Sequence, residues 1–223
     1  MHPRLILLMA FAGATLTAAQ ISLDATYTGF RLDDGSPFTG TIAAGWCPCD
    51  PIAESRSALV FDLPAISGTI TAAELRLSLG PDGFTSPQSS ETYEIYDVTS
   101  PISVITDPVS NPAPFVDLGT GTLFGSVTIG PIDEGSLIVI SLNAAALQFL
   151  NTASGQIAFG GAVSTLAKGS GINDQEIVFR NLSGDNLRQL VLTVEPSAVP
   201  EPSTALLAAA GLFSLLAWRR RNG

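Results

Sequence analysis

The sequence predicts an all-β domain, a β-sandwich or jelly roll with one short helix, between an N-terminal signal peptide and a C-terminal single transmembrane helix. The 223-residue chain is 46% hydrophobic but only 13% charged, which excludes disorder by composition. Its 21 Gly and 15 Pro separate short segments in which apolar and polar residues alternate, as in strands joined by tight turns. Both ends of the chain differ in composition from this middle part, which is long enough for one domain with its own core.

Residues 1–19 have the three parts of a secretory signal peptide. His2 and Arg4 form a short basic start, and residues 5–12 (LILLMAFA) form the apolar stretch. Small residues then lead to Thr17-Ala18-Ala19, which has the small side chains of an A-x-A-like cleavage site. An uncleaved transmembrane helix is the alternative, but the apolar stretch is too short for one. We therefore expect cleavage at Ala19 and export of the chain.

Period-two alternation predicts the strands of the domain at 20–195. Leu75, Leu77 and Leu79 alternate with polar neighbours, which is typical of a strand with one buried face. Residues 21–27 show the same alternation, whereas residues 56–63 are more continuously apolar and favour a strand covered on both faces. Further predicted strands are 92–98, 122–129, 136–142, 156–163, 176–180 and 190–195.

Turn clusters separate these segments, among them Gly80-Pro81-Asp82-Gly83 and Ser183-Gly184-Asp185. Only residues 143–150 (NAAALQFL) predict a helix, with Asn143 as its N-cap. Eight or more short strands with one minor helix indicate a β-sandwich.

The C-terminal end combines a proline-rich linker, an apolar run and a basic tail. Three prolines in residues 196–203 (PSAVPEPS) favour an extended, solvated linker. Residues 204–218 (TALLAAAGLFSLLAW) carry no charge and predict a transmembrane helix of about 22 Å, short of the ~30 Å hydrocarbon core. By the positive-inside rule, the arginines of residues 219–223 stay in the cytoplasm and the folded domain lies outside.

This order of parts resembles the PEP-CTERM sorting signal, in which a Pro-Glu-Pro motif precedes a short apolar helix and terminal arginines. The resemblance implies that an exosortase recognises Pro200-Glu201-Pro202 and processes the tail, with Arg219-Arg220-Arg221 as the stop signal. It further implies transient anchoring by the C-terminal helix. The expected final location is the cell surface or the extracellular matrix of a Gram-negative bacterium that makes exopolysaccharide. An ordinary C-terminal anchor would explain the helix and the arginines but not the motif.

A second resemblance concerns the middle of the chain. Residues 56–63, with an R…FDL pattern, precede residues 70–77, with an A.L.L pattern. This succession is similar to the start of DNRLRE-type, carbohydrate-binding-module-like jelly rolls, and residues 93–98 fit the next strand of that pattern. The resemblance covers about a third of the domain and implies a fold more than an activity.

Charge and histidine usage exclude several functions. Residues 20–199 carry 6 basic and 19 acidic side chains, a formal charge of −13 against −10 for the whole chain, which disfavours nucleic-acid binding. The only histidine is His2, inside the predicted signal peptide. The mature chain would therefore lack His-based triads, His general bases and His metal ligands. We predict no enzymatic activity and no cofactor.

Two cysteines, Cys47 and Cys49, flank Pro48 in the sequence WCPCD. In an oxidising compartment such a pair predicts a local disulfide that pins a loop. Free or intermolecularly paired thiols are an alternative, and a redox role is another, although redox catalysis usually uses C-x-x-C.

Acidic residues and aromatic residues leave two functional alternatives open. Asp33-Asp34-Gly35, and Asp174 with Glu176, lie at Gly-containing turns and are candidates for Ca²⁺ ligands or for ordinary solvated turn acids. A carboxylate-based hydrolase would need two acids about 5–10 Å apart in one cleft. Sugar binding would need exposed aromatic side chains, and the candidates are Trp46, Tyr27, Phe30, Phe38, Tyr93 and Tyr96.

The spacing of Tyr93 and Tyr96 in one strand points them to opposite faces, so at least one belongs to the core. Trp46 is either a binding aromatic or packs against the disulfide. The leading hypothesis is a non-enzymatic, exosortase-processed surface or matrix protein associated with exopolysaccharide. A carbohydrate-binding module with a defined ligand is the first alternative, and a surface cluster of Trp46 with a tyrosine and acids would favour it.

Overall fold

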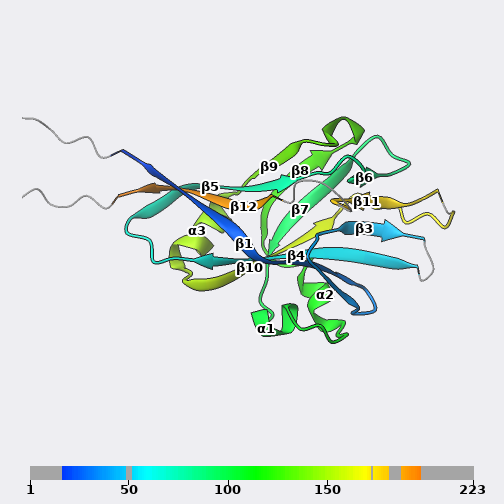
Figure 1. The fold of residues 1–223 in the computed structure, drawn as a ribbon, viewed down its shortest axis with the longest axis horizontal. Coiled ribbons are helices and arrows are strands. Elements are labelled where there is room, and N and C mark those ends of the chain that lie inside the picture. Colours follow the sequence, from blue (N-terminus) through cyan, green and yellow to red (C-terminus); the bar gives the residue numbers. More distant parts are fainter. Residues whose placement is uncertain (1–16, 49–51, 172, 181–186, 197–223) are drawn as a thin grey trace, which may run out of the picture.

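The computed structural model describes residues 17–48, 52–171, 173–180 and 187–196, and there the chain is an all-β domain with few helices (Figure 1). Most of the predicted signal peptide, the Pro-Glu-Pro linker, the predicted transmembrane helix at 204–218 and the arginine tail lie outside these residues. No helix within the described ranges has the length and apolar character needed to cross a membrane.

Every pair of strands in the sheet is antiparallel. The eight principal strands are β1 (Ala19–Leu32), β4 (Ala53–Leu63), β5 (Thr69–Ser78), β7 (Glu91–Asp97), β8 (Leu123–Ile129), β9 (Leu137–Ser141), β10 (Gly155–Val163) and β12 (Arg188–Glu195). The short strands are β2 (Pro37–Thr39), β3 (Ala44–Cys47), β6 (Phe84–Thr85) and β11 (Glu176–Val178). The sequence predicts all eight principal strands, but β2, β3 and β6 are not anticipated by it.

The principal strands follow the order β9-β5-β12-β1-β4-β10-β7-β8. β1 links the two halves of this order, because residues 19–24 pair with β12 and residues 25–32 pair with β4, with a bulge between Ala25 and Tyr27. The sheet curls until β8 returns beside β9, where the Asn143 N–H donates to the Phe124 carbonyl at 2.7 Å. This curl encloses the core.

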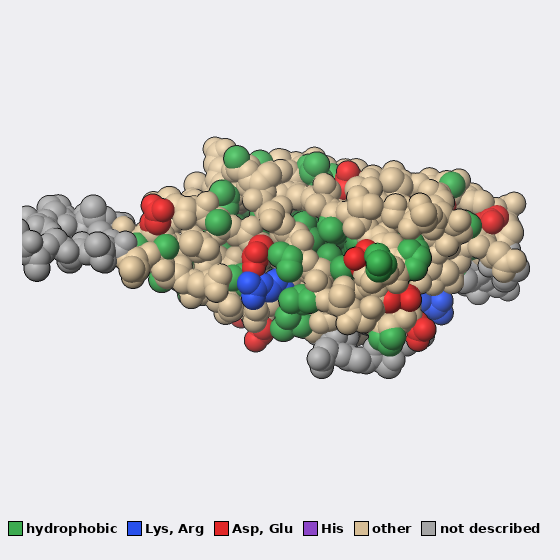
Figure 2. Space-filling view, turned by 90° about the horizontal axis from the view of Figure 1, so that it is seen from above, with side chains coloured by type: hydrophobic (Ala, Val, Ile, Leu, Met, Phe, Trp, Pro, Cys, Tyr) green, Lys and Arg blue, Asp and Glu red, His purple; other side chains and the backbone are tan. Residues whose placement is uncertain are grey.

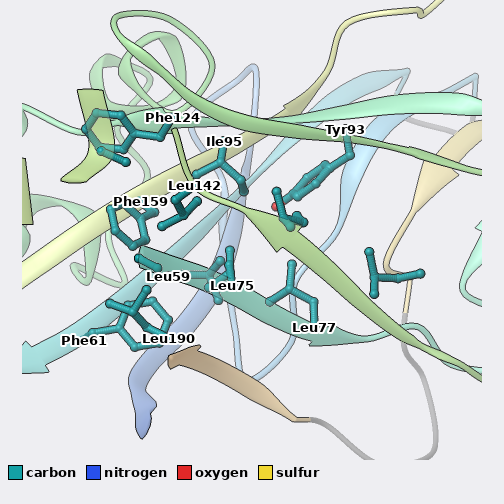
Figure 3. Close-up of a cluster of buried hydrophobic side chains, with 14 of the residues drawn as sticks. Leu59, Phe61, Leu75, Leu77, Tyr93, Ile95, Phe124, Leu142, Phe159 and Leu190 are labelled. Atoms are coloured by element: carbon teal, nitrogen blue, oxygen red, sulfur yellow. The ribbon is translucent and has the colours of Figure 1, made fainter. Parts of the chain in front are cut away.

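The core consists of the inward-facing side chains of this curled sheet (Figure 3). Leu75, Leu77 and Leu79 are fully buried, which confirms the alternation predicted for that strand. Aromatic rings from several strands meet there, and the Phe61 and Phe124 rings both contact Phe159. Side chains labelled in Figure 3 are Leu59, Phe61, Leu75, Leu77, Tyr93, Ile95, Phe124, Leu142, Phe159 and Leu190.

A second, smaller apolar cluster covers the outer face of β4 and β10. Ala58, Val60 and Ala158 pack there against Ile105 and Leu118, from the segment that contains α1 (Ile102–Ile105) and α2 (Ala113–Asp117). Because this cluster covers the outer face of β4, the strand is apolar on both faces. This agrees with the two-sided burial predicted for residues 56–63.

The prediction of a single helix is correct for α3 (Ala144–Thr152) but incomplete. The Asn143 side chain accepts from the amides of Ala145 and Ala146 at 2.9 and 3.1 Å, as expected of an N-cap. The short helices α1 and α2 and the 3₁₀ turn η1 (Pro131–Asp133) are additional. Helices of this length depend on tertiary contacts, which leave little trace in local sequence.

Both ends of the domain lie at the same end of the molecule. Ala19, the predicted cleavage position and the exposed first residue of β1, pairs with Val194 near the end of β12. Figure 1 shows these two strand ends together on the left, with β3 and β11 at the opposite end on the right. We call the first the tether end and the second the distal end.

Charged side chains are sparse on the face of the domain that Figure 2 shows. Figure 2 shows scattered acidic side chains and few basic ones on one face. This distribution agrees with the acidic composition of the domain.

Candidate ligand-binding face at the distal end

Four neighbouring strands, β3, β4, β10 and β7, present one outer face toward the distal end. Leu59 and Phe61 of β4 point into the core, so the alternating residues Glu54 and Arg56 point outward. Trp46 of β3 pairs with Glu54, and Tyr96 of β7 pairs with Gly160 of β10. The sequence-predicted aromatics Trp46 and Tyr96 therefore share this face, with β4 and β10 between them.

Glu54 holds two cations on this face. Its Oε1 accepts from Arg56 Nε at 3.0 Å, and its Oε2 accepts from Lys168 Nζ at 2.6 Å. The residue is buried, which strengthens both contacts relative to an exposed ion pair. Because two cations share one carboxylate, the triad carries a net charge of +1.

The α2 segment fixes the Arg56 guanidinium in place. Arg56 Nη1 donates to the carbonyls of Phe115 and Val116 at 3.1 Å each, and the guanidinium carbon lies 4.3 Å from the centroid of the Phe115 ring. A Cβ at Gly119 would lie 2.7 Å from Arg56 Nε, so a larger residue there would displace the guanidinium.

Lys168, the only lysine of the chain, places its ammonium 5.7 Å from the centroid of the Trp46 ring, within the range of a cation–π contact. The indole Nε1 of Trp46 donates to the Gly169 carbonyl at 3.0 Å, which fixes the ring against the same loop. Lys168 has φ of 55°, a left-handed conformation that is uncommon for a residue with a Cβ and occurs often at functional sites.

Two buried carboxylates hold the loop that carries Lys168. Glu176 accepts from the amides of Ala167 and Lys168 at 3.0 and 2.9 Å and from Gln88 Nε2 at 2.8 Å. Glu91 accepts from the Ser86 hydroxyl at 2.6 Å and from the Thr165 hydroxyl. Both glutamates are fully buried, and no cation pairs with either among the described residues.

Tyr96 forms the other side of the face. Its hydroxyl donates to the Glu94 carboxylate on the same strand. Burial, followed by this hydrogen bond and the charge of Glu94, raises the pKa of Tyr96 to about 12, although Arg56 acts in the opposite direction. Small residues, Gly160 and Ala162, lie on β10 between Arg56 and Tyr96, and a side chain at Gly160 would collide with the Leu118 backbone.

The remaining sequence-predicted aromatics lie elsewhere. Tyr93 is fully buried and bonds through its hydroxyl to Ser57 at 2.5 Å, so the prediction that it and Tyr96 face opposite ways is confirmed. Phe30 and Phe38 stack on each other with centroids 4.5 Å apart, between β1 and β2. Tyr27 packs against the cluster under α1.

Cys47 is disulfide-bonded, and Gln175 Nε2 lies 3.0 Å from its sulfur. Its predicted partner Cys49 lies outside the described residues, so the pairing stays a prediction. Cys47 follows Trp46 in β3, so the two side chains point to opposite faces of the sheet.

The acidic turns singled out in the sequence do not converge. Asp34 accepts from the Ser36 amide at 2.8 Å, and this hydrogen bond lowers the pKa of the Asp34 carboxyl. Asp174 accepts from the Gly171 amide at 2.6 Å, whereas Glu176 is directed toward residues 167–168. Across the described part of the chain, no three His, Cys, Asp or Glu side chains gather as a metal site would require.

Sequence reasoning missed Glu54, Arg56, Glu91 and the role of Lys168, and it named Glu176 only as a candidate Ca²⁺ ligand or solvated turn acid. One signal was present, namely an acidic residue that opens a short apolar strand in the sequence EIVF at 176–179. Its partners Gln88 and Ala167 lie in other parts of the chain, and no local pattern points to them.

A family model for the PEP-CTERM protein-sorting motif matches residues 198–221. The chain therefore carries this sorting motif, as its Val-Pro-Glu-Pro sequence predicts. The motif implies an exported protein that an exosortase processes and that is sorted to the surface of a Gram-negative bacterium. No curated protein matches the chain.

Proposed function

We propose that this protein is a non-enzymatic surface or matrix component that binds exopolysaccharide through the face at its distal end. The proposal rests on the positions of two features at opposite ends of the domain. β12, which precedes the sorting motif in the chain, ends at the tether end, whereas β3, which carries Trp46, lies at the distal end (Figure 1). A domain held by its C-terminal segment would present this face outward, away from the inner membrane.

The strand order supports a jelly roll for this domain. One sheet has the order β9-β5-β12-β1 and the other β4-β10-β7-β8, with β1 shared at the junction. Neighbours in each sheet come from distant parts of the sequence, as in the paired Greek keys of a jelly roll. This architecture suits a binding role, because paired strands hold the side chains of a site in fixed positions.

The contacts of the acids favour binding over hydrolysis. Both oxygens of Glu54 accept from cations, and Glu94 accepts from Tyr96. A general acid and a base would each need a carboxyl group available to the substrate. A carbohydrate-binding module with one defined glycan ligand is the second candidate, since Trp46, Tyr96 and two acids occupy one face.

Signal-peptide cleavage at Ala19 and transient anchoring by residues 204–218 complete the proposal. Intact mass and fractionation in the native host test it, alongside a variant with Pro200→Ala, Glu201→Ala and Pro202→Ala. We expect the wild type to lack both ends and to be recovered with exopolysaccharide, and the variant to stay in the inner membrane. Wild-type protein that keeps its tail, or that separates from exopolysaccharide on washing, would overturn the proposal.

A further inference from the structure

We infer that the Glu54–Arg56–Lys168 triad recognises the carboxylate of an acidic saccharide, with Trp46 beside the sugar ring. This inference rests on the proposed function and names the chemical class of its ligand.

The triad is the one place among the described ion pairs where cations outnumber the carboxylate they contact. Arg31 and Arg188 are buried, and Arg76 is paired with Glu74 alone. The exposed Arg180 is a single cation that donates to the Gln175 amide oxygen. Elsewhere the acidic surface repels a polyanion. An anionic polymer would therefore be directed to the triad, where two cations share one carboxylate.

The triad also has unused hydrogen-bond donors. The Lys168 ammonium has one acceptor, Glu54 Oε2, and its side chain is 47% exposed. Arg56 uses Nε and Nη1, and Nη2 has no acceptor among the described residues. The triad therefore has free donors and few free acceptors. A ligand group that only accepts hydrogen bonds suits it, and a carboxylate is such a ligand group.

The Trp46 ring favours a saccharide over an acidic peptide. Its indole lies under the Lys168 ammonium, so a carboxylate held by that ammonium would lie at the edge of a flat apolar surface. The C–H face of a pyranose ring can cover such a surface, while the ring's carboxylate reaches the ammonium. Glu176 holds the backbone of Lys168 before any ligand arrives, which reduces the entropy lost on binding.

The test uses the full chain, exported with its own signal peptide and purified in mild detergent. Affinity is measured for polygalacturonate, for its methyl ester, whose carboxylates are neutralised, and for polyglutamate, which has carboxylates but no sugar. Variants are Lys168→Met, which keeps the stem over Trp46, and Lys168→Arg, which keeps the charge. Arg76→Met is the matched control, because Arg76 belongs to an ion pair on β5, in the other sheet.

We expect polygalacturonate to bind, its ester and polyglutamate to bind weakly, and added salt to weaken binding. Lys168→Met should lower the affinity about tenfold, as loss of a charge-assisted hydrogen bond does, whereas Lys168→Arg and Arg76→Met should change it little. Equal binding of the ester, equal binding of polyglutamate, or no effect of Lys168→Met would overturn the inference. In the first case the proposed function survives, because a neutral glycan still binds. If neither saccharide binds and native exopolysaccharide does not either, the proposed function fails with it.

Discussion

The tether end and the distal end of this domain are stabilised in different ways. At the tether end, β5 and β12 pair over the whole length of β12, and their inward side chains are apolar except for Arg188 at the far end of β12. At the distal end, β3, β6 and β11 are strands of two to four residues, and fully buried glutamates hold the loops between them. Apolar burial gives the first region its stability, and hydrogen bonds to carboxylates give the second its shape.

This difference indicates which region is adapted for recognition. Lys168 and Phe179, the two non-glycine residues with positive φ among the described residues, both lie in the distal segment 164–180. Such backbone strain persists only where the surroundings enforce it. If the two regions are stabilised separately, substitutions can change the stability of the fold and the geometry of the site independently.

The largest expected effect is at the apolar end. Leu75→Ala removes a fully buried side chain from the middle of β5, and we expect it to lower the free energy of unfolding by about 2–5 kcal/mol. Urea unfolding of the full chain measures this, with Leu137→Ala on β9, where the side chain is 45% exposed, as the control. A loss below about 1 kcal/mol would show that apolar packing does not dominate there.

The second prediction concerns a substitution of Arg31 in the distal region. Its buried guanidinium donates to the carbonyls of Gly35, Val104, Ile105, Asp107 and Val109, so it holds the segment that in turn fixes Arg56. Arg31→Ala removes the shared donor of these five carbonyls, of which Gly35 keeps the Asn111 amide, and we expect a loss of about 3 kcal/mol.

Added ethylguanidinium should restore part of the melting temperature of the Arg31→Ala protein, because the ion fits the vacated site. Arg76→Ala, which removes an exposed ion pair, should cost less than about 1 kcal/mol and respond to no such addition. If ethylguanidinium raises the melting temperature of both variants equally, its effect does not come from binding to the five carbonyls that Arg31 contacts.

Glu176→Gln should disturb the site more than the fold. The amide keeps one acceptor oxygen but directs its NH₂ group at a backbone N–H, and we expect a cost of about 1–3 kcal/mol. Hydrogen exchange should accelerate at Ala167 and Lys168 and stay unchanged in β5. Glu74→Gln on the exposed face of β5 is the control, and uniform acceleration in both regions would argue against separate stabilisation.

The sequence predicts the apolar half of the fold well, because its information is local. Alternating leucines in β5 and the two-sided apolar run of β4 correspond to the faces they bury. The sorting motif is also a contiguous stretch of sequence, so it could be predicted without the structure. The distal site could not be predicted in the same way, since Glu54 meets Lys168 across 114 residues and Glu176 meets Gln88 across 88. Tertiary structure creates those pairs, and each residue alone resembles an ordinary surface charge.

The last prediction concerns the three tyrosines of the chain and applies only at alkaline pH. Burial raises the pKa of Tyr27, and it raises the pKa of Tyr93 and of Tyr96 to about 12, so all three tyrosines of the chain stay protonated in the fold at a pH where the unfolded chain ionises. Because each folded pKa exceeds the unfolded value of about 10, the tyrosines contribute stability below pH 10 that is lost as the pH rises toward 12. For the fully buried Tyr93 the loss is about 1.4 kcal/mol per pH unit.

Absorbance titration of native and urea-unfolded protein measures the tyrosinate directly, and Tyr93→Phe should reduce the fall in stability above pH 10. Tyr96→Phe should change that fall less, because Tyr96 is only partly buried. A native chain that titrates near pH 10 would mean that Tyr96 is open to solvent. The distal face would then be less rigid than its hydrogen bonds indicate. The two ends would differ in rigidity as well as in the kind of interaction that stabilises them.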